Sequence, residues 1–143
     1  MAKRTAKQTL TAKCDRVFST LVRLSKADAH GDVCCYTCGT VRHYKQMHAG
    51  HYMSRRNKSI RWHHDNARPQ CPGCNQYGKV NGPGESVIFG RKLSEEGVDV
   101  DELERLGRSV RVWTEDELEV LLHDLESMLA DLERKREQQH ANR

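Results

Sequence analysis

The sequence predicts an α+β protein in which a small zinc-stabilised core lies between an N-terminal helix and C-terminal helices. Three observations lead to this fold class. Apolar residues make up 36% of the 143 residues, so the hydrophobic core is small and needs a metal, a disulfide or a partner chain. Two Cys-x-x-Cys pairs enclose a polar stretch with little room for long elements. Apolar residues at helical spacing flank this stretch on both sides.

Residues 1–30 form the first predicted segment, a basic N-terminal helix. Over residues 8–26 the apolar side chains recur at steps of three and four, as on one face of a helix: Leu10, Cys14, Val17, Phe18, Leu21 and Leu24. The sequence KADAHGD then ends the pattern. Cys14 belongs to the apolar face, so we expect it in the core and not at a metal.

Residues 31–92 form the second predicted segment, and their cysteines are the strongest signal in the chain. CYTC and CPGC can bring four thiolates to one zinc ion, those of Cys35, Cys38, Cys71 and Cys74. Gly39 and Gly73 suit the tight turns of such knuckles. Four protein ligands leave no open position, so the zinc would be structural. A redox dithiol pair or plain buried cysteines are the alternatives, and Cys34 could replace Cys35 at a less usual spacing.

Residues 93–143 form the third predicted segment, an acidic helical region. Just before and within it, residues 85–96 and 99–106 predict two short helices that end at Gly97 and Gly107. The following RSVRVW sequence is compatible with a brief extended piece.

A longer amphipathic helix follows. Thr114 and Glu117 have the spacing of a capping box, in which each side chain satisfies a free amide of the first turn. The apolar residues behind them are spaced as in a heptad seam: Leu118, Leu121, Leu125, Met128 and Leu132. This seam either packs on its own domain or pairs two subunits, which makes 115–138 a possible dimerisation helix. We expect the charged end, 133–143, to be disordered.

Charge is distributed unevenly along the chain. Residues 1–26 carry seven Lys or Arg and one acidic residue, and residues 27–92 carry ten and four. Residues 93–143 carry seven basic and fifteen acidic residues. A basic body favours a polyanion, most simply nucleic acid, as the partner. The alternative is a solvated basic surface that aids solubility.

The start of the chain, MAKRTAKQTL, has no apolar stretch behind it, which argues against a secretory signal. No segment approaches the roughly 20 apolar residues of a membrane span. We therefore expect a cytoplasmic protein without membrane contact. In that compartment six cysteines favour metal binding over disulfides.

Several motifs together resemble the HNH nucleases, a superfamily with a ββα-metal active site. The resemblance rests on AGHYMSR, on HHDNARPQ and on CPGCNQYGK. More narrowly, FSTLVRLSKAD, CYTCG, AGHYMSR and RWHHDNARPQCPGCN resemble the phage NinG/Rap family of recombination endonucleases, which cut branched DNA such as Holliday junctions. This likeness covers about residues 17–82, and more weakly reaches 107. It implies a phage protein that acts in an infected bacterial host.

The resemblance also implies roles for individual residues. His51 would be the general base that deprotonates water, and Asn66 would orient it through a ring nitrogen or the adjacent backbone. Asn75 would offer its carbonyl oxygen to a catalytic Mg²⁺ or Mn²⁺ ion, which prefers oxygen ligands. Asn75 could instead merely cap the helix that follows Cys74. Lys79, one helical turn on, would face the same phosphate.

One position departs from the family pattern. Many HNH enzymes carry an acid or a histidine directly before the base, as a metal ligand, whereas this chain has Gly50. On an extended strand His48 points to the same face as residue 50, so we expect His48 to bind the metal. Asp65 and the histidines beside Trp62 are weaker alternatives, as is coordination by backbone or water.

The stretch between the base and Asn66 is basic, and it supplies the expected phosphate contacts: Arg55, Arg56, Lys58 and Arg61. We expect Tyr52 and Trp62 to pack in the core rather than to stack on bases. The predicted function is a metal-dependent DNA endonuclease, selective for branched DNA. The alternatives are a sequence-tolerant nicking HNH enzyme and a zinc-stabilised DNA-binding module without catalysis.

Overall fold

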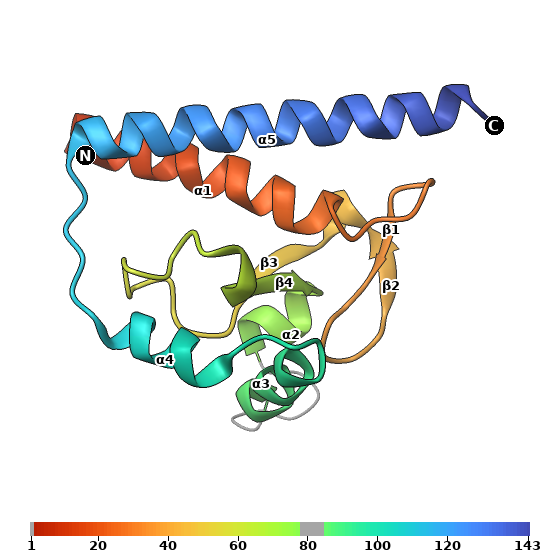
Figure 1. Cartoon of the computed structure of the whole chain (residues 1–143), viewed down its shortest axis with the longest axis horizontal. Coiled ribbons are helices and arrows are strands. Elements are labelled where there is room, and N and C mark those ends of the chain that lie inside the picture. The colour runs from red at the N-terminus through yellow and green to blue at the C-terminus, as the bar shows by residue number, and fades with distance from the viewer. Residues whose placement is uncertain (1, 78–84) are drawn as a thin grey trace. The chain divides into compact units, whose positions relative to one another are not determined.

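The computed structural model describes residues 2–77 and 85–143 and divides into two compact units. Unit 1 joins the two ends of the chain, Met1–Leu21 and Val112–Arg143, and unit 2 is Val22–Arg111. Figure 1 labels the helices and strands of both units. The architecture is mixed α+β, as predicted, with two small sheets and several helices. The predicted boundaries at residues 30 and 92 stay a prediction.

Unit 1 contains most of helix α1 (Ala6–Leu24) and helix α5 (Glu115–Ala141). The two helices lie side by side in Figure 1, and the Cys14 thiol donates a hydrogen bond to the Leu118 carbonyl oxygen at 3.6 Å. Cys14 and Leu118 are fully buried. The prediction of a core position for Cys14 is therefore confirmed.

Helix α5 begins with the predicted capping box. The Thr114 hydroxyl accepts from the Glu117 amide at 3.1 Å, and the Glu117 carboxylate accepts from the Thr114 amide at 2.9 Å. The prediction of a disordered end was wrong, because the helix continues to Ala141. Its last turns are rich in Glu, Arg, Lys and Gln, which have high helix propensity, and extending a formed helix costs little. An ion pair between Arg134 and Asp131 at 2.7 Å adds local support.

Unit 2 contains two separate two-stranded antiparallel sheets. Strand β1 (Asp32–Cys34) pairs with β2 (Val41–His43), and β3 (His48–His51) pairs with β4 (Ala67–Gln70). In the second sheet His48 lies opposite Gln70 and His51 lies opposite Ala67. Short 3-10 helices precede β3 and β4, at Tyr44–Gln46 and His64–Asn66.

Three short helices follow the sheets: α2 (Pro72–Tyr77), α3 (Glu85–Glu95) and α4 (Val100–Arg108). The helix before Gly97 was predicted correctly. The prediction that Gly107 ends α4 was wrong, because Gly107 lies inside the helix. A Cβ at Gly107 would come within 2.8 Å of the Met53 side chain, so this glycine permits close packing and does not end the helix. Residues 110–114 belong to no helix or strand, and the brief extended piece expected at RSVRVW stays a prediction.

Two apolar clusters form the core of unit 2. One joins the helices to the loop after β3 through Ile60, Phe89, Leu93 and Leu103. Tyr52 packs against it, with its ring centroid 5.9 Å from that of Phe89, as expected for a core residue. The other consists of Val33, Met47 and three cysteines of the knuckles. No helix in the described part of the chain has the length and apolarity needed to cross a membrane.

Candidate functional site

The four predicted zinc ligands come together in unit 2. Cys35 directly follows β1, Cys38 lies in the β1–β2 connection, and Cys71 and Cys74 lie at the start of α2. Their sulfur atoms all lie within 4.8 Å of one another, and those of Cys38 and Cys71 are 3.8 Å apart. Ligands about 2.3 Å from a tetrahedral zinc ion are separated by about 3.8 Å, so the donor set fits a structural zinc. All six cysteines of the chain are free of disulfides.

The backbone of the first knuckle prepares its thiols for a metal. Gly39 adopts a φ of 78°, a left-handed conformation that glycine allows, and its amide donates to the Cys35 carbonyl oxygen. Burial raises the pKa of the Cys35 thiol, but hydrogen bonds from the backbone of Cys38 and Cys71 and from Thr37 outweigh it and lower the pKa to about 6. A low thiol pKa favours the thiolate, which is the form that binds zinc.

The other two cysteines stay outside the cluster. Cys34 is exposed, so Cys35 and not Cys34 belongs to the first pair. Burial, with the nearby Asp15 and Glu126 carboxylates, raises the pKa of the Cys14 thiol to about 11. Cys14 is therefore a neutral core residue.

A second group of polar residues lies where the β3–β4 sheet meets α2. His48, the first residue of β3, contacts Asn75 in the middle of α2. The Asn75 amide nitrogen Nδ2 donates to His48 Nδ1 at 3.0 Å. These two residues, predicted as ligands of a catalytic ion from positions 27 apart in sequence, are thus neighbours.

His51, the predicted base, ends the same strand. Its Nε2 donates to the Arg61 carbonyl oxygen at 2.9 Å. Because a carbonyl oxygen only accepts, this bond selects the tautomer with the proton on Nε2 and the lone pair on Nδ1. The ring is held by the loop that connects β3 to β4.

Asn66 is fully buried, and its side chain bonds to the loop backbone and not to the His51 ring. Its side chain accepts from the Met53 amide at 2.8 Å and donates to the Met53 and Ile60 carbonyl oxygens at 2.9 and 3.4 Å. Asn66 therefore ties together the loop that supplies the Arg61 carbonyl. The predicted role of Asn66 in orienting His51 stays a prediction, since its side chain bonds to the backbone of Met53 and Ile60.

Gln70 is a residue to which the sequence interpretation gave no role. It is 5% exposed, and it extends over Gly50, where an added Cβ would overlap its amide oxygen Oε1. Its amide nitrogen donates to the Thr37 hydroxyl at 3.2 Å. A signal for it existed in the sequence, because side chains alternate between the two faces of a strand. With the register known, Gln70 lies opposite His48 and on the same face.

The predicted DNA-contacting residues lie on the β3–β4 loop. Arg55, Arg56 and Lys58 are exposed, whereas Arg61 is half-buried, with its guanidinium 5.5 Å from the Trp62 ring. Lys79, the remaining member of the set, lies outside the described residues. Three of the four basic residues of this loop are therefore exposed to solvent.

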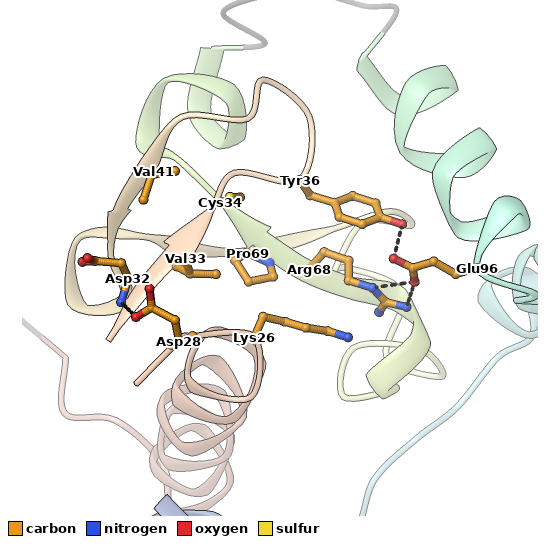
Figure 2. A pocket seen from close by; sticks show the side chains of 11 residues that line it. Lys26, Asp28, Asp32, Val33, Cys34, Tyr36, Val41, Arg68, Pro69 and Glu96 are labelled. Atoms are coloured by element: carbon orange, nitrogen blue, oxygen red, sulfur yellow. Dashed lines mark hydrogen bonds and ion pairs between the residues drawn. The ribbon is translucent and has the colours of Figure 1, made fainter. Parts of the chain in front are cut away.

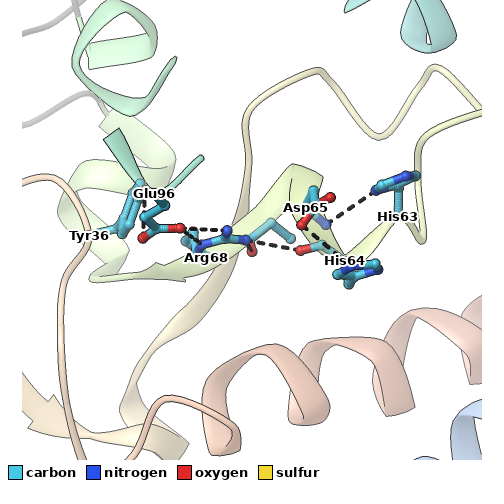
Figure 3. A network of polar contacts seen from close by, with 7 residues as sticks. Tyr36, His63, His64, Asp65, Arg68 and Glu96 are labelled. Atoms are coloured by element: carbon cyan, nitrogen blue, oxygen red, sulfur yellow. Dashed lines mark hydrogen bonds and ion pairs between the residues drawn. The ribbon is translucent and has the colours of Figure 1, made fainter. Parts of the chain in front are cut away.

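Arg68 is the centre of a separate polar network, drawn in Figure 3. Its guanidinium is buried, pairs with Glu96 at 2.7 Å and donates to the His64 and Ala67 carbonyl oxygens. The Tyr36 hydroxyl donates to the same Glu96 carboxylate at 3.0 Å. Burial raises the pKa of Glu96, but these hydrogen bonds outweigh it and lower the pKa.

His63 and His64 stack at a centroid distance of 5.2 Å. The His63 ring accepts from the Asp65 amide at 3.2 Å, and the His64 side chain is 82% exposed. Burial and the neighbouring His64 lower the pKa of His63. Within the described residues the four cysteines are the one group of at least three His, Cys, Asp or Glu placed to hold a metal, so Asp65 and these histidines form no such site.

A pocket of about 450 Å³ opens beside β1 and β4, lined by Lys26, Cys34, Tyr36, Arg68 and Glu96 among others. Figure 2 shows the Arg68–Glu96 pair at one end and Asp28 and Asp32 at the other. Its lining includes none of His48, His51, Gln70 or Asn75. The pocket is therefore not part of the histidine and amide group.

Comparison with protein families finds a match to the family of the bacteriophage lambda NinG protein over residues 2–137. No curated protein and no solved structure matches the chain. The family match spans both units and every site residue described above. The chain belongs to the family of the bacteriophage lambda NinG protein.

Proposed function

We propose that this protein is a metal-dependent DNA endonuclease of the HNH type. One observation carries the proposal: His48 at the start of β3 contacts Asn75 of α2 at 3.0 Å. The same strand ends at His51, whose ring is hydrogen-bonded to the Arg61 carbonyl oxygen. A strand pair followed by a short helix, with a cysteine pair at the helix start, is also the arrangement expected of a ββα-metal core. Membership of the NinG family supports the phage setting.

His51 acts as the general base in this proposal. With Nε2 bonded to the Arg61 carbonyl oxygen, Nδ1 carries the lone pair that can take a proton from water. The same carbonyl then stabilises the protonated ring by accepting from Nε2–H. Asn66 is a positioning residue, since its hydrogen bonds to Met53 and Ile60 hold the loop that bears Arg61.

His48 and Asn75 hold the catalytic ion, Mg²⁺ or Mn²⁺. Two neighbouring ligand atoms of an octahedral ion with bonds of about 2.1 Å lie about 3 Å apart. The His48 Nδ1 and the Asn75 amide are 3.0 Å apart, and a half-turn of that amide puts its oxygen in place of its nitrogen. When bound, such an ion stabilises the negative charge that develops on the phosphate and the leaving oxygen.

The exposed arginines of the β3–β4 loop and Lys79 bind the DNA backbone. Arg55 and Arg56 follow the base by only four and five residues along the chain. Contacts to phosphates position the substrate without reading its sequence. Such contacts suit both activities of the enzyme class: structure-selective cutting of branched DNA such as Holliday junctions, which the resemblance to the NinG/Rap family implies and which we propose, and sequence-tolerant nicking, the alternative.

The decisive experiment compares cleavage of a four-way junction, a linear duplex and a single strand, with Mg²⁺ or Mn²⁺ and with EDTA. We expect the junction to be cut and EDTA to stop the reaction. His51→Ala is expected to lower the rate at least 100-fold, since a positioned base contributes about that much. His64→Ala, which removes an exposed histidine, is the matched control and keeps the wild-type rate.

A cleavage rate in His51→Ala equal to wild type would remove His51 as the base. Binding of the junction by the wild-type protein without cleavage of any substrate would instead favour the second function, a zinc-stabilised DNA-binding module. Gly50 is the observation that favours this alternative, because it leaves the usual ligand position before the base without a side chain.

Homodimerisation through α5 is a further part of the proposal. Leu118 and Leu125 of the heptad seam are already buried in the single chain, whereas Met128 is 55% exposed and Val120 is 62% exposed. A dimer would therefore use the outward residues of α5 and would place two sites on opposing DNA strands. Sedimentation of the wild-type protein and of Met128→Glu tests it, and a wild-type monomer at all concentrations contradicts it.

A further inference from the structure

Gln70 is one of three buried polar side chains in and next to strand β4, with Asn66 and Arg68. A buried polar atom without a hydrogen bond costs roughly 1–3 kcal/mol, so such atoms are normally paired. Asn66 uses both its oxygen and its nitrogen, and Arg68 is paired with Glu96 and two carbonyl oxygens. Gln70 differs, because no residue in the described part of the chain donates to its oxygen Oε1.

The position of this oxygen is set from both ends of the side chain. At the backbone, β4 places Gln70 opposite His48 in the antiparallel register, so both side chains lie on one face of the sheet. At the tip, the amide nitrogen donates to the Thr37 hydroxyl at 3.2 Å, within the first cysteine knuckle. This bond anchors the tip of the side chain at Thr37, and in the structure Oε1 is the amide atom that lies towards Gly50.

Gly50 is shaped to receive the Gln70 side chain. A Cβ at this position would overlap Gln70 Oε1 and would lie 2.5 Å from its carbon Cδ. The glutamine amide therefore fills the space in which a side chain of residue 50 would begin. Residues 48 and 50 project to the same face of β3, so this space adjoins His48, whose ring contacts Asn75.

We propose that Gln70 supplies the metal-binding oxygen that the chain lacks at position 50, completing a site with His48 and Asn75. The inference rests on the proposed nuclease function and extends it. An amide carbonyl oxygen is a suitable ligand for Mg²⁺ or Mn²⁺. In this chain the ligand comes from the neighbouring strand β4. Gly50 has no side chain and so leaves room for the Gln70 amide.

The first test measures Mn²⁺ binding to the zinc-loaded full chain, by the electron paramagnetic resonance signal of free Mn²⁺. Gln70→Met keeps the length of the side chain and removes the oxygen, and we expect it to weaken Mn²⁺ binding at least tenfold. Gln70→Glu keeps an oxygen there and is expected to bind as tightly as wild type or more tightly. Gln46→Met changes an exposed glutamine and serves as the matched control.

Zinc content and the thermal midpoint are measured on the same samples. Unchanged Mn²⁺ affinity in Gln70→Met overturns the inference, and so does a wild-type protein that binds no Mn²⁺. Mn²⁺ binding that depends on Gln70, in a protein that cuts none of the DNA substrates, keeps the ligand assignment and removes the nuclease proposal.

A second test moves the oxygen and covers the case in which Gln70→Met fails to fold. Gly50→Asp alone introduces a clash with Gln70 and is expected to lower the thermal midpoint. Gly50→Asp combined with Gln70→Ala removes the clash and is expected to regain both the midpoint and Mn²⁺ binding. A double variant that recovers its stability and still binds no Mn²⁺ contradicts the proposal that the Gln70 oxygen takes the ligand position of a side chain at residue 50.

Discussion

The two sheets of unit 2 are alike in size and pairing and differ in what they bury. In the β1–β2 sheet, strand β2 exposes Val41 and Arg42, and Val33 is the one buried residue. In the β3–β4 sheet all four residues of β4 are buried, among them Arg68 and Gln70. A short strand can form without burying polar side chains. The burial of Arg68 and Gln70 in the β3–β4 sheet, and of no polar residue in the β1–β2 sheet, therefore calls for a physical reason.

The difference separates the sheet next to the first cysteine pair from the sheet that carries the histidines of the candidate site. The β1–β2 sheet carries the first cysteine knuckle and contributes Val33 to the core around the cysteines. The β3–β4 sheet carries both histidines of the candidate site and buries polar groups that hold its loop and its glutamine in place. A buried polar network specifies one arrangement when every member is paired. The Gln70 oxygen is therefore informative, since none of the residues 2–77 and 85–143 donates to it.

The largest expected effect is the loss of the structural zinc that the four clustered cysteines are expected to hold. Cys71→Ser removes a ligand at the end of β4, and the apparent binding free energy of a structural zinc is about 10 kcal/mol or more, much of it folding energy. We expect zinc to be lost and unit 2 to unfold. Zinc content and circular dichroism measure this. Cys34→Ser, next to the cluster but outside it, should retain zinc and structure.

Asn66→Ala tests whether the buried polar groups of the second sheet hold its loop. The substitution removes three hydrogen bonds and takes away the Asn66 partners of the half-buried Met53 amide and carbonyl, while the Ile60 carbonyl keeps its bond from the His63 amide. We expect a loss of about 2–4 kcal/mol in the free energy of unfolding, measured in urea. Asn57→Ala in the same loop should cost less than about 0.5 kcal/mol. Equal effects would mean that Asn66 has no special part in the loop.

The basic β3–β4 loop is expected to bind DNA, whereas Arg42 on strand β2 is not. Arg55→Ala with Arg56→Ala should weaken junction binding about tenfold and reduce the slope of log affinity against log salt by about 2, one for each phosphate contact. Arg42→Ala on exposed β2 is the control. An equal loss in Arg42→Ala would indicate a general charge effect and no DNA-binding loop.

The smallest expected effect concerns the Arg68–Glu96 pair and depends on pH. Since the pKa of Glu96 is lowered in the folded protein, the pair stabilises the fold above the usual glutamate pKa of 4.5, and this is lost as the pH falls through the lowered value. Glu96 is 40% exposed, so we expect a contribution of about 1 kcal/mol at pH 7.

Glu96→Gln should therefore be less stable than wild type at pH 7 and nearly equal to it at about pH 3. Glu95→Gln, in an exposed pair with Arg91, is the control and should show no such change. A difference between Glu96→Gln and wild type that persists unchanged to low pH would show that the carboxylate charge is not its source.

Local patterns in the sequence predicted the helices near the two ends of the chain and the four cysteines that cluster. Apolar spacing predicted α1 and α5, the Thr114–Glu117 pair predicted the start of α5, and the two cysteine pairs predicted the metal cluster. The errors arose where tertiary packing or helix extension overrides a local signal. Gly107 reads as a helix end but is a close contact for Met53, and the charged end continues a helix already formed.

The sequence by itself determined the residue types of the site: two cysteine pairs spaced as for zinc, two histidines three residues apart and an asparagine after the last cysteine. Only the tertiary structure decided which of their atoms meet, because strand register and hydrogen-bond geometry join residues far apart in the chain. It brought His48 to Asn75, anchored His51 on the Arg61 carbonyl, and placed Gln70 over Gly50. In the sequence Gly50 looks like a missing ligand. In the folded protein the Gln70 side chain occupies the place that a side chain at residue 50 would take.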